Sequence, residues 1–553
     1  MFINFFKTGI RNLFKDKFHG CINLIGLTIG LTITICIAIY LQNELNYDNF
    51  HLNKNQLHRI GIKTFRQGDM LNDGRTFTPP IGPTMKNEIA GIKNYTRYST
   101  PRETYFSIEG KSIKLDELRC ADSTFFSLFS FPLLQGNPTH ALKLPYSIVL
   151  TENMANRLFG SVDILGKTVR MNNERDLQVT AIMADLPVNS HIQFEALISF
   201  STLYQEPENQ MNWTGGGQYI TYVQLENNTL PSDVEQQLPA FLWRHINKEY
   251  ATHNMRIEAS LQALPDVHFH HNSYSSNLRT NLYLIGVMAL LILLIACINF
   301  INLTTARAGR RAREVGVRKV LGASRTSLRW QFFGEAFLLT SFAFILSLFL
   351  VEAVVPFMPP LFGKPINNLD FFNWTSIGGL LLLLILVGIG AGAYPSIHLA
   401  SFDTTKTLKG VPLMSGKSGL RKSLMVFQFI VSTVLIISTL IIAQQLSFTE
   451  SKTLGFEKEN ILVVPLLGEE VQTKLSSLKQ ALKNTPKIIA TAACSETPGK
   501  GFTENGYRPE GIEEPMFIKV VDVDDEYFQV FDLELKEGRM FSLDQPSGLR
   551  MKF

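Results

Sequence analysis

The segment TTARAGRRAREVGVRKVLGASRTSLR, residues Thr304–Arg329, decides the fold class because an uncharged run of membrane-spanning length leads directly into it. It carries eight Lys and Arg residues against a single acid, Glu314. Arg310, Glu314 and Arg318 lie four residues apart, so on a helix they form a row of opposite charges along one face. This arrangement predicts a charged helix immediately beside the membrane.

Apolar residues in the same segment are spaced for the opposite face of that helix, namely Ala312, Val315, Val317 and Val320. Gly322 stands where a helix often ends. We therefore predict a basic amphipathic helix of about three turns, held against the membrane by its neighbours. The simpler alternative is a solvated cytoplasmic loop whose charges only record the preference of Lys and Arg for the inner side.

Five blocks of the sequence reach the roughly 20 apolar residues that a helix needs to cross a bilayer. They are Ile22–Leu41, Asn281–Leu303, Trp330–Val351, Phe371–Leu399 and Ser423–Phe448. Only the third block contains a charge, Glu335, near its first turn. The sequence predicts a polytopic α-helical membrane protein with five spans. Its formal charge of +4 over 553 residues gives no reason to expect nucleic acid as a partner.

Basic residues beside the spans predict the orientation of the chain. They crowd the N-terminus, the 304–329 segment and the 403–422 segment, which all fall inside if the first span runs outward and the others alternate. Residues 2–18 place aromatic and basic side chains on opposite sides, which predicts an interfacial helix bound to membrane lipid. We expect a protein of the cell (inner) membrane with a cytoplasmic N-terminus.

The resulting domain plan alternates membrane and extracytoplasmic parts. In chain order it comprises an interfacial helix and first span (1–43), an extracytoplasmic domain (44–280), a bundle of three spans with the basic helix at 310–323 (281–402), a cytoplasmic linker (403–422), a fifth span (423–448) and a second extracytoplasmic region (449–553). Strand-like runs SIVLT, TVRM, LQVTAIMA, ALISF and YITYVQL alternate with helical stretches near 151–159 and 232–248, so we predict an α+β domain.

An internal repeat links the two extracytoplasmic regions. Asp122–Gly136 reads DSTFFSLFSFPLLQG and Asp524–Gly538 reads DDEYFQVFDLELKEG, without a gap and 402 residues apart. The same offset carries the first span onto the fifth. We predict a parallel repeat whose second copy is incomplete, and we expect these 553 residues to be a fragment of a longer product.

Sites for chemistry are weakly indicated. Three histidines in Asp266–His271 lack a Cys or a carboxylate pair at ligand spacing, so we expect a polar approach to the second span and no metal site. The segment GVPLMSGKS (410–418) has one residue too many for a phosphate-binding loop. We predict no catalytic residues and no cofactor. Glu335 either marks an intramembrane functional site or pairs with the basic segment, and the sequence leaves both open.

The chain resembles the permease subunits of MacB/FtsX-like ABC transporters. The resemblance covers essentially the whole length and rests on four stretches: REVGVRKVLGAS (313–324), AYPSIHLASFDTTKTLKG (393–410), RKSLMVFQF (421–429), and YSIVLTENMANRLFG with ILGKTV (146–169). It implies an extracytoplasmic domain of the MacB periplasmic core type. It also implies that the basic helix is a coupling helix that docks on a separate cytoplasmic ATP-binding subunit.

By this resemblance the coupling residues are Arg313, Glu314, Gly316, Arg318, Lys319 and Gly322. Members of the family transmit ATP-driven motion outward to export or extract drugs, peptides or lipoproteins, or to regulate an outer partner. A dimer or a second permease half is an implied partner. Two alternatives remain open. One is a membrane receptor or regulator with an extracytoplasmic sensing domain, and the other is an enzyme with an extracytoplasmic active site.

Overall fold

The computed structural model describes residues 17–358, 374–401 and 419–537, apart from 109, 207–210, 214–217, 271–277, 307, 453, 467–470, 472, 500–502 and 508–515. Most of the predicted interfacial helix and of the linker lies outside these residues. Two compact units are formed, one from Met1–Tyr47 with Asn277–Glu450 and one from Asp48–Ser276 with Ser451–Phe553. Each unit is described by itself below.

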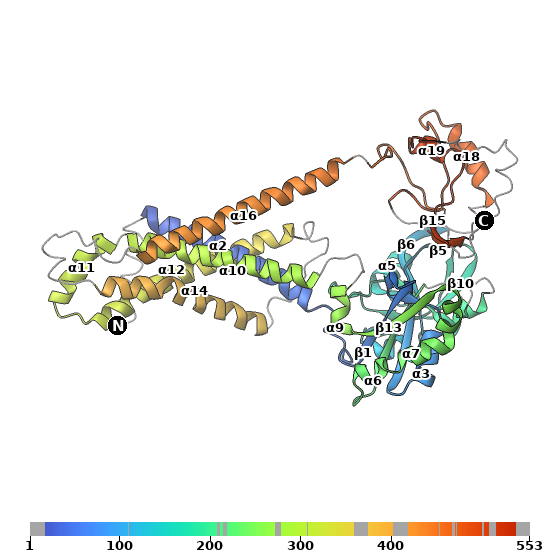
Figure 1. Cartoon of the computed structure of the whole chain (residues 1–553), viewed down its shortest axis with the longest axis horizontal. Helices are drawn as coiled ribbons and strands as arrows, with labels where there is room; N and C mark the ends of the chain where they lie inside the picture. The colour runs from blue at the N-terminus through green and yellow to red at the C-terminus, as the bar shows by residue number, and fades with distance from the viewer. Residues whose placement is uncertain are drawn as a thin grey trace. The chain divides into compact units, whose positions relative to one another are not determined.

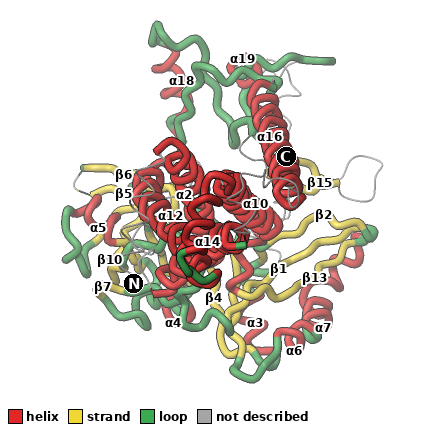
Figure 2. Tube along the Cα trace, turned by 90° about the vertical axis from the view of Figure 1, so that its left-hand side faces the viewer, coloured by secondary structure: helices red, strands yellow, loops and turns green. Residues whose placement is uncertain are grey.

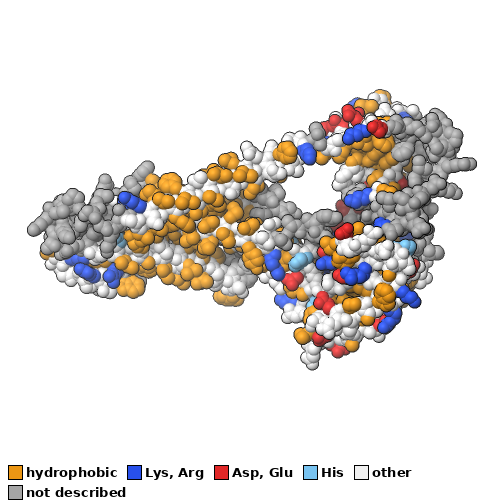
Figure 3. All heavy atoms as spheres, viewed as in Figure 1, with side chains coloured by type: hydrophobic (Ala, Val, Ile, Leu, Met, Phe, Trp, Pro, Cys, Tyr) orange, Lys and Arg blue, Asp and Glu red, His pale blue; other side chains and the backbone are white. Residues whose placement is uncertain are grey.

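The first unit is helical (Figure 1), and apolar side chains cover much of the face that Figure 3 shows. Five described helices are long and apolar enough to cross a membrane, which confirms the five predicted spans. The helices of this unit are α2 (Lys17–Leu45), α10 (Leu278–Ala306), the short α11 (Ala308–Val320), α12 (Arg325–Val354), α14 (Trp374–Ala400) and α16 (Gly419–Ser451).

Glycines bring the spans close together. A Cβ added at Gly30 of α2 would stand 2.6 Å from Cβ of Ala296 on α10. One added at Gly388 of α14 would stand 2.6 Å from the Phe337 ring on α12. Small residues at such crossings let helices pack by van der Waals contact, which is the main attraction available in lipid. Gly390 of α14 differs from these two glycines, because a Cβ added there would meet nothing within 4 Å.

The second unit contains a 13-stranded sheet formed by the first extracytoplasmic segment, which we call the outer domain. Its main path runs β11-β8-β10-β9-β5-β6-β4-β12-β1-β13, and β11 also pairs with β6. This extra pairing closes six strands into a ring around one core that includes Phe106, Ile148 and Val179. On the other part of the sheet, α3, α6 and α7 pack against β4, β12 and β13 (Figures 1 and 2).

The strands of the outer domain are β1 (Leu57–Arg66), β2 (Asp69–Gly74), β3 (Thr76–Phe77), β4 (Ile92–Ser99), β5 (Arg102–Ile108), β6 (Lys111–Ala121), β7 (Leu133–Gln135), β8 (Ser147–Thr151), β9 (Thr168–Met171), β10 (Arg175–Met183), β11 (Ala196–Ser199), β12 (Tyr219–Leu225) and β13 (Met255–Ala263). Its helices are α3 (Ile81–Glu88), α4 (Phe125–Leu128), α5 (Glu152–Phe159), α6 (Pro231–Glu235), α7 (Leu238–Leu242), α8 (Lys248–Tyr250) and α9 (Leu264–Val267), with short η turns between some of them.

The α+β prediction is confirmed, and the five predicted strand runs correspond to β8, β9, β10, β11 and β12. The helical stretch expected near 232–248 is broken into α6, α7 and a π-helical turn, η2 (Trp243–Asn247), and α7 carries Pro239 in its first turn. A proline is tolerated there but not inside a helix, because it has no N–H to donate. The expected polar approach at Asp266–His271 is wrong in part, since Leu264 and Val267 lie in the outer-domain core and His268 is buried, while His271 lies outside the described residues.

The second extracytoplasmic segment forms α18 (Leu475–Lys483), β14 (Thr503–Tyr507), β15 (Met516–Val520) and α19 (Tyr527–Val530). The repeat is visible in its hydrogen bonds. Asp122 exchanges two bonds with the backbone of Arg97, and Asp524 exchanges the same two bonds with the backbone of Ala493. In both copies a one-turn helix, α4 or α19, begins three residues after the aspartate. The sequence repeat is therefore also a structural repeat.

Candidate functional site

The candidate site is α11, the basic helix between the second and third spans. Its end is a Schellman turn, in which the N–H of Gly322 donates to the Lys319 carbonyl and the N–H of Ala323 donates to the Arg318 carbonyl. Gly322 has a φ of +93°, which a residue with a side chain rarely adopts. The helix therefore stops where the sequence predicted.

α12 begins directly after this turn. Ser324 caps α12, and its hydroxyl accepts a hydrogen bond from the N–H of Ser327 at 3.2 Å. Four residues, Leu321 to Ser324, thus separate the last residue of α11 from the first residue of α12. So short a connection keeps the two helix ends together.

A small apolar cluster fixes α11 on the spans. Val315 is buried together with Leu328 and Phe332 of α12 and with Leu399 and Ala400 of α14. Burying one such aliphatic side chain stabilises the packed state by roughly 1.5–3 kcal/mol. The cluster places one face of α11 against the ends of two spans.

Polar contacts add a second attachment to α12. Arg318 Nη2 lies 2.7 Å from Glu314 Oε1, which is the predicted pairing along one helix face. Arg318 Nη1 donates to Gln331 Oε1 at 2.8 Å, and Gln331 Nε2 donates to Glu335 Oε1 at 3.3 Å. Glu335 is thus connected to the basic segment through Gln331.

Lys319 attaches the same helix to α14. Its Nζ donates to the backbone carbonyl of Ala400 at 2.9 Å, and Ala400 is the last residue of that helix. A helix C-terminus leaves carbonyl groups without helical partners and carries partial negative charge, so a lysine there is favourable. The two neighbouring cations, Arg318 and Lys319, therefore bind different spans.

The apolar residues of α11 do not share one packed face, although their spacing predicted that they would. Val315 is 1% exposed, whereas Val317 is 47% and Val320 66% exposed. Positions 315 and 317 differ by about 200° around a helix, so they point to opposite sides. Leu321 is 81% exposed. The result is an exposed apolar surface formed by Val317, Val320 and Leu321.

The other predicted coupling residues occupy different environments. Gly316 is buried, Glu314 is exposed and Gly322 is exposed in the turn. The side chains of Arg310, Ala312 and Arg313 lie outside the described residues. Sequence reasoning missed Gln331 and Leu321. Gln331 is four residues before Glu335, and this spacing was the only signal that could have indicated a hydrogen bond between them.

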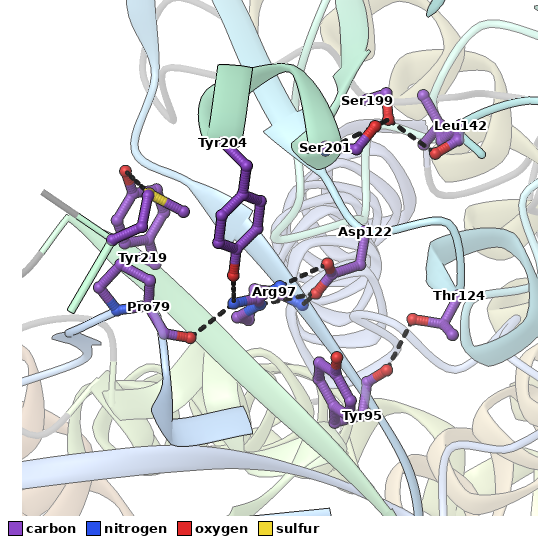
Figure 4. Close-up of polar contacts among 11 residues, drawn as sticks. Pro79, Tyr95, Arg97, Asp122, Thr124, Leu142, Ser199, Ser201, Tyr204 and Tyr219 are labelled. Atoms are coloured by element: carbon purple, nitrogen blue, oxygen red, sulfur yellow. Dashed lines mark hydrogen bonds and ion pairs between the residues drawn. The ribbon is translucent and has the colours of Figure 1, made fainter. Parts of the chain in front are cut away.

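The outer domain contains a dense polar cluster of another kind. The Arg97 guanidinium donates to both oxygens of Asp122 at 2.8 and 2.9 Å, to the Pro79 carbonyl and to the Tyr204 hydroxyl (Figure 4). Burial alone would lower the pKa of Arg97, but the bonds to Asp122 and its charge raise that pKa above its usual value. The cluster is a structural ion pair.

A buried row of titratable groups lies near the start of the outer domain. His191 stands between Asp48 and Tyr222, with Nδ1 2.7 Å from the carboxylate and Nε2 2.5 Å from the hydroxyl. Asp48, Tyr222 and the side chain of His191 are each at most 3% exposed, which favours a structural role. Within the described part of the chain, no group of three His, Cys, Asp or Glu residues could hold a metal ion, and the cysteines are free.

Comparisons with known proteins match two successive stretches of the chain. A family model of the MacB-like periplasmic core domain matches residues 21–241, and a model of the FtsX-like permease C-terminal region matches residues 286–404. The second match includes α11 and the spans on either side of it. The chain belongs to the MacB/FtsX-like ABC transporter permeases.

Related permeases are similar over most of this chain. YvrN, an ABC transporter permease of Bacillus subtilis (strain 168), is 20% identical over 421 residues, which are 73% of this permease and 98% of YvrN. The macrolide export ATP-binding/permease protein MacB of Campylobacter jejuni (strain 81-176) is 26% identical over 441 residues, which are 73% and 61% of the two chains. This permease spans only 57% to 59% of three ATP-binding/permease proteins of Pseudomonas.

Among solved structures, a domain of a permease protein from Porphyromonas gingivalis has 23% sequence identity and a TM-score of 0.35, and the match covers 38% of this permease and 91% of that domain. The periplasmic region of MacB from Actinobacillus actinomycetemcomitans has 18% identity and a TM-score of 0.26, covering 36% and 87%. The family models and the related permeases show that the chain is an ABC transporter permease of the inner membrane with an extracytoplasmic domain. Permeases of this class work with a cytoplasmic ATP-binding subunit.

Proposed function

We propose that this permease transmits ATP-driven motion from a separate cytoplasmic ATPase to its extracytoplasmic domains, for the export or extraction of a drug, a peptide or a lipoprotein. The observation that carries the proposal is the attachment of α11. This short helix is fixed to two spans on one side and carries exposed apolar residues on the other. When a docked partner displaces such a helix, the displacement is transmitted to the two spans.

The exposed residues of α11 support docking of a protein. Val317, Val320 and Leu321 would leave water if a partner covered them, and each Å² of apolar surface so buried is worth roughly 25 cal/mol. Glu314 is exposed on the same helix and gives the surface an acidic group within a basic segment. We propose that Arg313, Glu314, Gly316, Arg318, Lys319 and Gly322 form or support this docking helix.

The proposed orientation puts the N-terminus and α11 in the cytoplasm and the outer domain outside. Lys and Arg beside the spans support it, because they favour the inner side of the membrane. Membrane lipid under residues 2–18, and a dimer or a second permease half beside the spans, complete the proposed partners.

Co-purification tests the docking claim. The permease is expressed with candidate ABC ATPases from the same organism, and Glu314→Lys and Gly316→Trp are compared with the wild type on the ATPase that binds. We expect each change to weaken association by about tenfold or more, which corresponds to roughly 1.4 kcal/mol. The first reverses an exposed charge, and the second forces a large side chain into a buried position.

Glu352→Lys is the matched control, because it reverses an exposed acid near the other end of α12. It should bind the ATPase like the wild type. Unchanged association in both α11 variants would contradict docking through this helix.

A further inference from the structure

Arg318 holds a position that the docking role alone does not require. Its guanidinium contacts Glu314 on its own helix and Gln331 on the next one. Gln331 in turn contacts Glu335, which lies one helical turn further along α12. The three contacts make a continuous polar row, here called the Arg318 relay, from the exposed side of α11 into the third span.

We propose that Arg318 is a positioning residue that makes α11 and α12 move as one body, with Gln331 and Glu335 as its anchors inside the span. The inference rests on the proposed function and deepens it, because it names the residues through which motion enters the membrane. Lys319 plays the corresponding part for α14 through the Ala400 carbonyl.

The physical reason is directionality. Apolar contacts such as those of Val315 resist separation, but they favour no particular orientation of the two helices. Hydrogen bonds weaken steeply when their angle or length departs from the preferred values, so they resist sliding and rotation. Arg318 is half-buried, which shields its bonds from water more than those of an exposed pair.

The geometry of the turn limits how α11 and α12 can move relative to each other. Because the connection from α11 to α12 is only four residues long and is closed by the Schellman turn, the near ends of the two helices cannot separate. Rotation about this connection remains possible. Gln331 lies along α12 beyond the connection, so the bond that Arg318 donates to it opposes that rotation. Glu335 accepts a bond from the Gln331 amide on the same helix and so holds the Gln331 side chain in place.

The test uses the full permease in complex with its ATPase, in a background without the five native cysteines. One cysteine is introduced at Val354, at the far end of α12, where the side chain is 41% exposed. Its rate of labelling by a thiol reagent is measured with and without trapping of the ATPase by ATP and vanadate. Association is measured on the same samples.

In the otherwise unchanged permease we expect trapping to change the labelling rate. Gln331→Leu, which removes the acceptor of the Arg318 bond, should keep the ATPase bound but lose this change. Glu335→Gln, whose amide oxygen can still accept the bond from Gln331, should retain it. Ser324→Ala removes a helix cap at the same turn without touching the relay, so it controls for simple loosening of the structure and should also retain the response.

A response that survives in Gln331→Leu would overturn the proposal, as would an equal loss in Ser324→Ala. Loss of ATPase binding in Gln331→Leu would also overturn it, because the relay would then serve docking. If the unchanged permease fails to bind the ATPase, the proposed function fails as well. That result can be told apart from a failure of the relay proposal alone. In that case Gln331→Leu still binds the ATPase and still shows the change in labelling rate.

Discussion

Arg97 and Asp122 place two opposite charges inside the outer domain, where their side chains are 4% and 13% exposed. Taking charges out of water is costly, and the bidentate geometry together with bonds to Pro79 and Tyr204 offsets that cost. The Arg97 guanidinium also lies 4.0 Å from the centre of the Phe200 ring, which adds a favourable cation–π contact. Removing either charge would leave the other one buried without a counter-ion.

We predict that Asp122→Asn lowers the free energy of unfolding of the outer domain by about 3 kcal/mol, because it leaves the Arg97 charge uncompensated. Urea unfolding of the purified permease, followed by pulse proteolysis of the outer domain, measures the change. Asp176→Asn is the control, since Asp176 and Arg170 form an exposed pair, and it should cost about 0.5 kcal/mol or less. Equal effects in the two variants would contradict the argument.

The lowered pKa of the buried His51 should make the stability of the outer domain depend on pH. Burial lowers the pKa of His51 to about 4, while the nearby Asp48 partly offsets the shift and His191 adds to it. Between this pKa and the unfolded value of 6.5, the unfolded chain binds more protons. Stability should therefore be fully present above pH 6.5 and should fall as the pH is lowered towards 4.

Replacing His51 by Phe should flatten this part of the pH profile, whereas replacing the exposed His140 by Gln should leave it unchanged. Pulse proteolysis at a series of pH values measures both. His51→Phe also leaves the N–H of Ser130 without the ring nitrogen that accepts its bond, so some loss at all pH values is expected. A pH profile as steep as that of the wild type would exclude His51 as its source.

At the scale of elements, helix packing depends on which side of a span a glycine occupies. Gly388 and Gly392 of α14 lie against Phe337, Phe333 and Ala336 of α12, whereas Gly390 lies between them in sequence and faces open space. Two residues along a helix turn the side-chain direction by about 200°. The same substitution at neighbouring glycines should therefore have opposite consequences.

We predict that Gly388→Leu destabilises the bundle by at least about 2 kcal/mol, because its side chain must displace the Phe337 ring. Gly390→Leu should be neutral or slightly stabilising, since leucine favours a helix more than glycine does. Thermal unfolding of the purified permease in detergent compares the two variants. A Gly390→Leu protein as unstable as Gly388→Leu would show that the helix faces are assigned wrongly.

Helices and strands made mostly of apolar residues could be predicted from sequence. Strands that mix charged and apolar residues could not. The spans are continuous apolar runs, and β8 and β12 are rich in apolar and β-branched residues, so composition was enough to find them. β6 reads KSIKLDELRCA, with only Leu115, Leu118, Cys120 and Ala121 buried, and its charged residues hid it. Strands of this kind are fixed by partners on both sides, and β6 pairs with β4, β5 and β11.

In the candidate site, too, only contacts within one element could be predicted from the sequence. The pairing of Glu314 with Arg318 depends on one helix and was predicted from spacing. The bond from Arg318 to Gln331 and the bond from Lys319 to Ala400 join helices that are adjacent only after the turn and the bundle have formed. No spacing within one element carries that information.

At the scale of the whole molecule, the proposed orientation has a direct test by labelling. Single cysteines replace His140 in the outer domain and Arg325 at the start of α12, both exposed positions, in a background without native cysteines. We predict that an impermeant thiol reagent labels position 140 in intact spheroplasts and labels position 325 only after the membrane is permeabilised. The reverse pattern would invert the proposed topology.

The two copies of the aspartate motif are held by different cations. Asp122 is paired with Arg97 on a neighbouring strand, while Asp524 is paired with Lys479 of α18, where both side chains are 20% or more exposed. Added salt screens exposed pairs far more than enclosed ones. Rising ionic strength should therefore weaken the ion pair of the second copy at lower salt concentrations than the ion pair of the first. Duplication has preserved the backbone bonds of the motif while allowing the two copies to differ in how strongly their stability depends on the surrounding solution.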